Sequence, residues 1–103
     1  MKLYGIKACD TCRRARKALP DAEFIDVKDD GISPEVLVSA LSEFGGALIN
    51  RKSTTWRNLT EEARATAPLE LLAREPTLMK RPLIIDGARM TLGWSPEVQT
   101  TWD

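Results

Sequence analysis

The chain has 103 residues, 43% of them hydrophobic and 29% charged, which is typical of one folded domain rather than a disordered chain. Its 15 basic residues balance its 15 acidic ones, and this zero net charge argues against direct binding of nucleic acid or of an anionic membrane. Histidine is absent and cysteine occurs twice, which excludes Ser-His-Asp and Cys-His catalysis and leaves too few ligands for zinc within one chain.

The apolar segments are all short. None approaches the roughly 18 residues that a membrane-spanning helix needs, and the first residues lack the apolar core of a secretory signal. We therefore expect a cytoplasmic protein with no membrane partner. We also expect a monomer with no bound cofactor or metal. In the cytoplasm a cysteine pair is more often catalytic, redox-active or metal-binding than structural.

The first elements in chain order are a strand and a helix. KLYGI (2–6) is apolar and partly β-favouring, so it predicts a strand that stops at a polar turn. The next segment, DTCRRARKAL (10–19), is rich in helix formers. Asp10 or Thr11 is expected to cap this helix, and Pro20 to end it.

A second strand and a second helix follow. EFIDV (23–27) predicts a strand by its alternation, and DDGIS (29–33) predicts a turn. Ser33, Pro34 and Glu35 are typical of a helix start, with serine as N-cap and proline in the first helical position. Apolar residues then recur at helical spacing until Gly45 and Gly46 end the helix.

The middle of the chain is less regular. NRKSTTWRN (50–58) predicts a polar loop that holds Trp56, and Thr60 and Pro68 each predict the start of a short helix.

The last third returns to strands. PLIID (82–86) and RMTLG (89–93) predict two strands joined by a tight turn at Asp86-Gly87, and SPEVQTTW (95–102) predicts a final helix. The first two strands, joined by a helix, should be parallel, and the last two should be antiparallel.

This order predicts an α/β fold over a single domain, residues 1–103. The expected fold is thioredoxin-like: a mixed four-stranded sheet flanked by helices, with a helical insertion between the second and third strands. A Cys-x-x-Cys motif between a first strand and a first helix is typical of that arrangement.

Cys9 lies where the first strand has ended and the first helix is about to begin. A thiolate there faces unpaired backbone N–H groups and the positive end of the helix dipole, which lower a cysteine pKa. Lys7, Arg13 and Arg14 are near in sequence and would act in the same direction. Cys12 follows one helical turn later, close enough to form a disulfide with Cys9 but more shielded. The alternative is that both are small buried apolar residues.

Four sequence blocks resemble the ArsC/Spx family, which includes glutathione-dependent arsenate reductases, Spx transcription regulators and small reductase-like proteins. The small reductase-like members resemble this chain most. The blocks are LYGIKACDTCRRA (3–15), LINRKSTTWRNL (48–59), LMKRPLI (78–84) and LGWSPEVQ (92–99).

By this resemblance Cys9 matches the nucleophilic cysteine of the family and Cys12 the second cysteine of the Spx-type motif. Arg51 and Arg81 match two arginines that surround the oxyanion in the arsenate reductases. In thioredoxin-like folds, the proline corresponding to Pro82 follows a cis peptide bond opposite the nucleophile, and the backbone before it pairs with a disulfide or glutathione.

Two departures argue against arsenate as the substrate. The third arginine of the arsenate reductases falls near Leu92, and Asp10 replaces a glycine beside the nucleophile. Of the other candidates, Lys7 is expected to bind substrate, whereas Trp56 and Trp94 are interpreted as anchors of loops on the core.

Three hypotheses follow. The first is a thiol-disulfide oxidoreductase that acts on glutathione or on a small-molecule or protein disulfide, with Cys9 as nucleophile, Cys12 as resolving cysteine and glutathione as reductant. The second is an Spx-like regulator, for which the resemblance implies RNA polymerase as partner and a Cys9–Cys12 redox switch. The third is an arsenate reductase.

Overall fold

The computed structural model describes every residue from Met1 to Asp103. The chain forms two compact units, one made of residues 1–30 and 81–103 and the other of residues 31–80. None of the helices is both long and apolar enough to cross a bilayer. The single domain over residues 1–103 stays a prediction.

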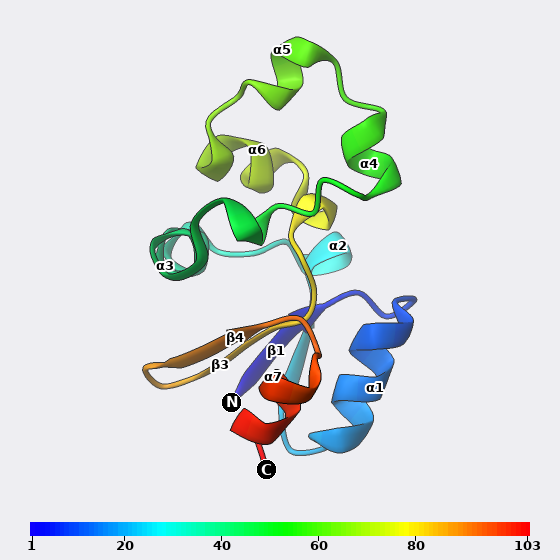
Figure 1. Ribbon diagram of the computed structural model, residues 1–103, viewed down its shortest axis with the longest axis vertical. Coiled ribbons are helices and arrows are strands. Elements are labelled where there is room, and N and C mark those ends of the chain that lie inside the picture. The colour runs from blue at the N-terminus through cyan, green and yellow to red at the C-terminus, as the bar shows by residue number, and fades with distance from the viewer. The chain divides into compact units, whose positions relative to one another are not determined.

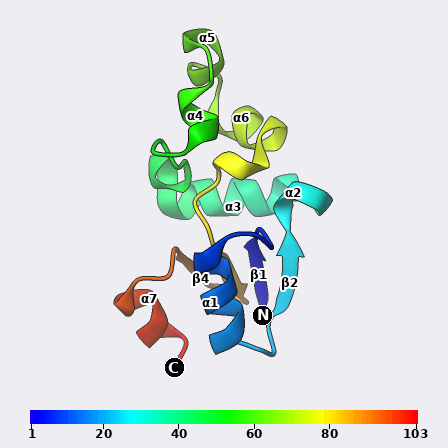
Figure 2. The same ribbon diagram turned by 90° about the vertical axis from the view of Figure 1, so that its right-hand side faces the viewer.

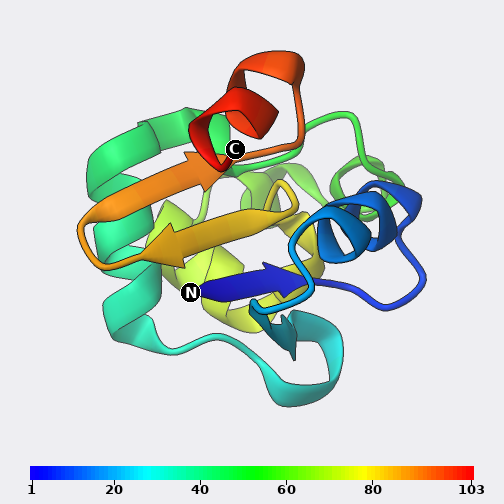
Figure 3. The same ribbon diagram turned by 90° about the horizontal axis from the view of Figure 1, so that it is seen from below.

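The first unit contains the mixed four-stranded sheet that the element order predicts. Its strand order is β2-β1-β3-β4, with β1 parallel to β2 and antiparallel to β3, and β4 antiparallel to β3 (Figure 3). The predicted parallel and antiparallel pairs are confirmed. The strands are β1 (Lys2–Gly5), β2 (Glu23–Asp26), β3 (Leu83–Asp86) and β4 (Arg89–Leu92).

Two helices of this unit pack on one face of the sheet. Leu3 and Ile84 are cross-strand partners and are fully buried together with Ala15 of α1. Trp94 and Trp102, which lie before and after the last helix of the chain (red in Figure 1), pack against the same cluster, and this confirms the interpretation of Trp94 as an anchor. The helices of this unit are α1 (Asp10–Ala18), α2 (Val27–Asp30) and α7 (Pro96–Thr101).

The second unit is the predicted helical insertion between the second and third strands. Its helix α3 lies beside α6 (Figure 2). Both helices carry fully or almost fully buried leucines. The elements are α3 (Pro34–Phe44), η1 (Gly45–Leu48), α4 (Thr54–Arg57), α5 (Glu61–Arg64), α6 (Pro68–Arg74) and η2 (Pro76–Leu78).

The predicted helix starts at Ser33, Thr60 and Ser95 are confirmed. Each hydroxyl accepts a hydrogen bond from the backbone N–H three residues later, at 3.4, 3.1 and 3.3 Å respectively. Such a cap contributes about 1 kcal/mol, because it satisfies a donor that the helix leaves unpaired. Gly45 ends α3 with φ 58°, a conformation that favours glycine.

Three sequence-based predictions are wrong in detail. The N-cap of α1 is Cys9 rather than Asp10 or Thr11, because the helix begins at Asp10 itself. The second strand ends at Asp26, and the residues from Val27 on, expected partly as a turn, form α2. The polar loop 50–58 contains the short helix α4, which forms because the Ser53 hydroxyl accepts a hydrogen bond from the Trp56 N–H at 3.1 Å.

Candidate functional site

Cys9 lies at the junction of a tight turn and helix α1. Its N–H donates to the carbonyl of Ile6 at 3.0 Å, and its own carbonyl accepts the first helical hydrogen bond from the Arg13 N–H at 2.9 Å. The side chain makes no capping hydrogen bond, and the residue is half-buried. The Cys9 sulfur therefore stands at the N-terminal end of α1, where the helix dipole favours a negative charge.

The surroundings of Cys9 favour its thiolate. Burial raises the pKa of the Cys9 thiol, but hydrogen bonds from the backbone and side chain of Cys12, together with the hydrogen bond and charge of Arg81, outweigh burial. The pKa of Cys9 is therefore below its ordinary value. These contacts place a partly exposed thiolate beside a guanidinium, which is the environment of a reactive cysteine.

Cys12 has the opposite environment. Its side chain is fully buried, and burial together with the neighbouring Cys9 raises the pKa of Cys12 to about 11, although the backbone of Ile6 acts in the other direction. Cys12 therefore stays a thiol at neutral pH and donates a hydrogen bond to Cys9. Both cysteines are free, and their order of acidity is the one that the sequence predicts.

Gly5 provides the space for Cys12. A Cβ atom placed on Gly5, at the end of β1, would lie 2.6 Å from the Cys12 sulfur and 3.4 Å from a ring carbon of Phe24. The 2.6 Å distance to sulfur is too short for a real Cβ atom, so the first turn of α1 can approach β1 this closely only because residue 5 lacks a side chain.

Arg81 and Pro82 belong to the same unit as Cys9. The Arg81–Pro82 peptide bond is cis, as the resemblance implies, and Pro82 is fully buried. The Arg81 side chain donates a hydrogen bond to the Cys9 sulfur, so the return of the chain to this unit at residue 81 places a positive charge beside the nucleophile.

Two of the three other cations predicted near Cys9 face carboxylates, and the third, Arg14, is exposed. The Lys7 ammonium lies 3.6 Å from the carboxylate of Asp29, and the Arg13 guanidinium lies 3.3 Å from that of Asp10. All four side chains are largely exposed, so each pair contributes little to stability. The lower pKa of Cys9 comes from Cys12 and Arg81 rather than from these cations.

Asp26 is a residue of the site that the sequence did not reveal. It is 4% exposed, and its carboxylate accepts hydrogen bonds from three backbone N–H groups: Lys7 at 3.0 Å, Lys28 at 2.9 Å and Asp29 at 3.2 Å. The first bond holds the turn before Cys9, and the other two hold the start of α2. An aspartate at the end of an apolar strand was the available signal, because such a residue is a frequent cap.

A second brace of the same turn comes from α1. The Arg13 Nε donates to the Lys7 carbonyl at 3.0 Å, so the Lys7 peptide groups are held from both sides. Hydrogen bonds on both sides of this residue hold the turn that leads to Cys9.

Arg51 belongs to the other unit. Segments 48–50 and 78–80 pair there through an Ile49–Met79 bridge, with hydrogen bonds of 2.8 Å from the Asn50 N–H and 2.7 Å from the Lys80 N–H. After this bridge the Arg51 guanidinium donates to the Gly46 carbonyl at 2.9 Å and lies 5.4 Å from the ring centre of Trp56.

An open cavity of about 450 Å³ adjoins this bridge. Three cations line it together with Asn50: Arg51, Lys52 and Lys80. These side chains could hold an anionic group, whereas His, Cys, Asp and Glu side chains nowhere gather in a group of three that could hold a metal ion.

The chain was compared with known proteins. A model of the ArsC family matches residues 4–101. An uncharacterised protein of Haemophilus influenzae is 39% identical over 90% of each chain, and the global transcriptional regulator Spx of Streptococcus pyogenes is 32% identical over 92% of this chain and 78% of its own.

Solved structures agree with this match. A protein named YffB has a TM-score of 0.87 at 36% identity, over 96% of this chain and 95% of its own. An arsenate reductase (ArsC) related protein from Brucella melitensis has a TM-score of 0.72 at 33% identity, over 99% of this chain and 94% of its own. The chain belongs to the ArsC family.

Proposed function

We propose that this protein is a thiol-disulfide oxidoreductase in which Cys9 is the nucleophile and glutathione the reductant. The observation that carries the proposal is the contrast between two neighbouring thiols: the pKa of Cys9 is lowered, whereas that of Cys12 is raised to about 11. A thiolate, not a thiol, attacks sulfur, so at neutral pH the first step belongs to Cys9.

In the first step the Cys9 thiolate attacks one sulfur of a disulfide. The new bond joins Cys9 to that sulfur, the old sulfur–sulfur bond breaks, and the second sulfur leaves as a thiolate that takes a proton from water. Arg81 acts by stabilising the Cys9 thiolate before the attack, through its hydrogen bond and charge.

In the second step the mixed disulfide on Cys9 is reduced. A glutathione thiolate attacks the substrate-derived disulfide and regenerates Cys9, or Cys12 attacks Cys9 and forms an internal disulfide that two glutathione molecules then reduce. With a pKa of about 11, roughly one Cys12 in ten thousand is a thiolate at pH 7. Part of that high pKa comes from Cys9 itself, so Cys12 becomes easier to ionise once the Cys9 charge is lost.

The deciding experiment offers the reduced protein hydroxyethyl disulfide, glutathione disulfide and arsenate separately, with glutathione and glutathione reductase to follow turnover. Mass spectrometry identifies adducts on Cys9. Turnover of a disulfide with a Cys9 adduct supports the proposal. Turnover of arsenate alone would instead support an arsenate reductase. Leu92 argues against that activity, because the arsenate reductases have an arginine near this position.

A second function is supported by the 32% identity to the Spx regulator of Streptococcus pyogenes and by the Cys9-x-x-Cys12 motif, which resembles the Spx-type motif. In that proposal the Cys9–Cys12 pair is a redox switch, and the partner implied by the resemblance is RNA polymerase. Gel filtration of the reduced and the diamide-oxidised protein with purified bacterial RNA polymerase tests it. Co-elution in one redox state only, without disulfide turnover, would favour the regulator over the enzyme.

A further inference from the structure

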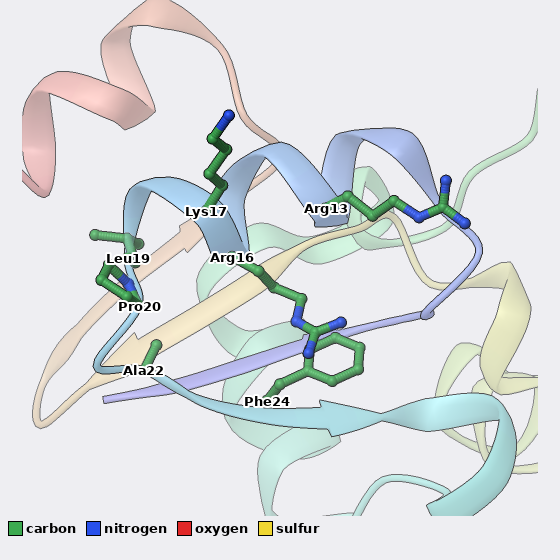
Figure 4. A pocket seen from close by; sticks show the side chains of 7 residues that line it. All are labelled: Arg13, Arg16, Lys17, Leu19, Pro20, Ala22 and Phe24. Carbon is green, nitrogen blue, oxygen red and sulfur yellow. The ribbon is translucent and has the colours of Figure 1, made fainter.

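A second cavity lies away from Cys9, between the side of α1 and strand β2. Its volume is about 300 Å³, and side chains from α1, from the following loop and from β2 line it (Figure 4). β2 is an edge strand, paired only with β1, so no further strand closes this side. Nothing in the proposed oxidoreductase mechanism uses this cavity.

The cavity is cationic. Three of its lining residues are Arg13, Arg16 and Lys17, and no carboxylate is among the others. The Arg13 side chain has partners in Asp10 and in the Lys7 carbonyl, whereas the side chains of Arg16 and Lys17 make no ion pair or hydrogen bond with the chain.

Strand alternation keeps acidic groups out. Phe24 lies on the same sheet face as its β1 partner Leu3, against α1. Glu23 points to the opposite face. Burial raises the pKa of Tyr4 on that face, and the charge of Glu23 raises it further. The uncompensated positive charge on the α1 side is therefore a consequence of the register of β2.

Arg16 is held in place by an aromatic ring. The carbon at the centre of its guanidinium lies 3.9 Å from the ring centre of Phe24, and Figure 4 shows the two groups face to face. Stacking covers one face of the guanidinium and leaves its N–H edge for a ligand, so Arg16 is preorganised for a planar or tetrahedral anion.

The rest of the cavity is apolar. Leu19 and Pro20 line it at the C-terminal end of α1, and Ala22 lines it in the loop that leads to β2. Arg16 and Lys17 also lie in the last turn of α1, where positive charge offsets the helix dipole. That role requires neither the Phe24 stack nor an apolar wall beside the charges.

We propose that this cavity binds a small amphipathic anion, in which a phosphate or carboxylate group is joined to an aromatic or aliphatic body. The anionic group pairs with the free edge of the Arg16 guanidinium, and Lys17 adds a second positive charge to the lining. The apolar body lies against Leu19, Pro20 and Ala22. A free small molecule and the tail of a larger one share this chemistry, and the size of probe that binds distinguishes them.

The test uses the full chain labelled with nitrogen-15 and three probes: phenyl phosphate, inorganic phosphate and phenol. We expect saturable shifts of the amide signals of residues 13–17 and 22–24 with phenyl phosphate. Its dissociation constant should be at least about tenfold lower than that of either half-probe, since each half makes only one kind of contact. Equal affinity for inorganic phosphate would overturn the amphipathic ligand.

Matched variants locate the site. Arg16→Gln should weaken phenyl phosphate binding about tenfold, because it removes a charge-assisted hydrogen-bonding group. Arg14→Gln removes the same charge from an exposed position of α1 that does not line the cavity, and it should change the affinity less than about twofold. Equal losses in both variants would show diffuse attraction to a basic helix and would overturn the site.

Two further arms complete the test. Cys9→Ser should bind phenyl phosphate as the original protein does. The binding test is therefore independent of the proposed oxidoreductase activity. A probe that carries the phenyl phosphate group at the end of a polyethylene glycol chain shows whether a tethered group enters. Its binding would indicate the tail of a larger molecule, and its exclusion a free one.

Discussion

The buried carboxylate of Asp26 accepts a hydrogen bond from the backbone N–H of Lys7 at 3.0 Å, so the end of β2 holds the turn that carries Cys9. This hydrogen bond does not involve the Cys9 sulfur. Asp26 is a positioning residue: it acts on the nucleophile through the backbone between Ile6 and Cys9.

Asp26→Asn should lower the free energy of unfolding by about 2 to 3 kcal/mol, because the amide presents one acceptor where the carboxylate presents two charged ones. Urea denaturation measures this loss. Asp21→Asn is the matched control: Asp21 is exposed, and its change should stay within about 0.5 kcal/mol. Equal effects of the two substitutions would contradict the role of Asp26.

The free energy of unfolding should depend on pH in the acid range because of Asp26. Burial raises the pKa of this carboxyl, but hydrogen bonds from the N–H groups of Lys7, Asp29 and Lys28 outweigh burial, so its pKa in the folded protein is lowered. The stabilisation is then complete above the unfolded-state pKa of about 3.9 and is lost as the pH falls through the lower folded value. Asp26→Asn should flatten the unfolding free energy in that acid range, as urea titrations at pH 2 to 6 would measure.

Gly5→Ala should destabilise the protein by about 1 to 3 kcal/mol, because the new methyl group would overlap the Cys12 sulfur. In a Cys12→Ala background the overlap with sulfur disappears, so the same substitution should cost less. A double-mutant cycle from thermal denaturation measures the coupling. Strict additivity would show that Gly5 is not needed for the approach of Cys12.

Arg81→Gln should raise the pKa of Cys9, because it removes a charge that lowers it. Once the pKa lies above the pH, each further unit of increase lowers the thiolate fraction by about tenfold. The measurement is the pH dependence of iodoacetamide alkylation in a Cys12→Ala background, where only Cys9 reacts. Arg14→Gln in that background provides the control, and an unchanged profile in Arg81→Gln would argue against the contact between Arg81 and Cys9.

Cys9→Ser should abolish disulfide reduction, whereas Cys12→Ser should keep the first step and accumulate a mixed disulfide on Cys9. Glutathione can release that adduct, so Cys12→Ser should lose part of its turnover rather than all of it. Turnover with glutathione and mass spectrometry of the trapped protein measure the two effects. A Cys12→Ser protein as inactive as Cys9→Ser would indicate an obligatory dithiol cycle, and full activity of both would contradict the enzyme.

Local sequence determined most of the elements of this fold. Ser33, Thr60 and Ser95 cap their helices with hydroxyls only three residues from the N–H groups that they satisfy, and the tight turn at Gly87 (φ 62°) joins adjacent strands. Such interactions depend on neighbours within one turn of chain, so their residue types suffice to predict them. The placement of Cys9 at the start of a helix follows from the same local pattern.

Only the tertiary structure decided the surroundings of Cys9. Its contact with Arg81 joins residues 72 positions apart, and the Asp26–Lys7 bond spans 19. Lys7 and Arg13 are close to Cys9 in sequence, yet carboxylates from α2 and α1 compensate their charges. A local sequence pattern shows which charged residues are near Cys9 in the chain. Strand pairing and the path of the backbone decide which of these charges contacts the sulfur and which pairs with a carboxylate instead.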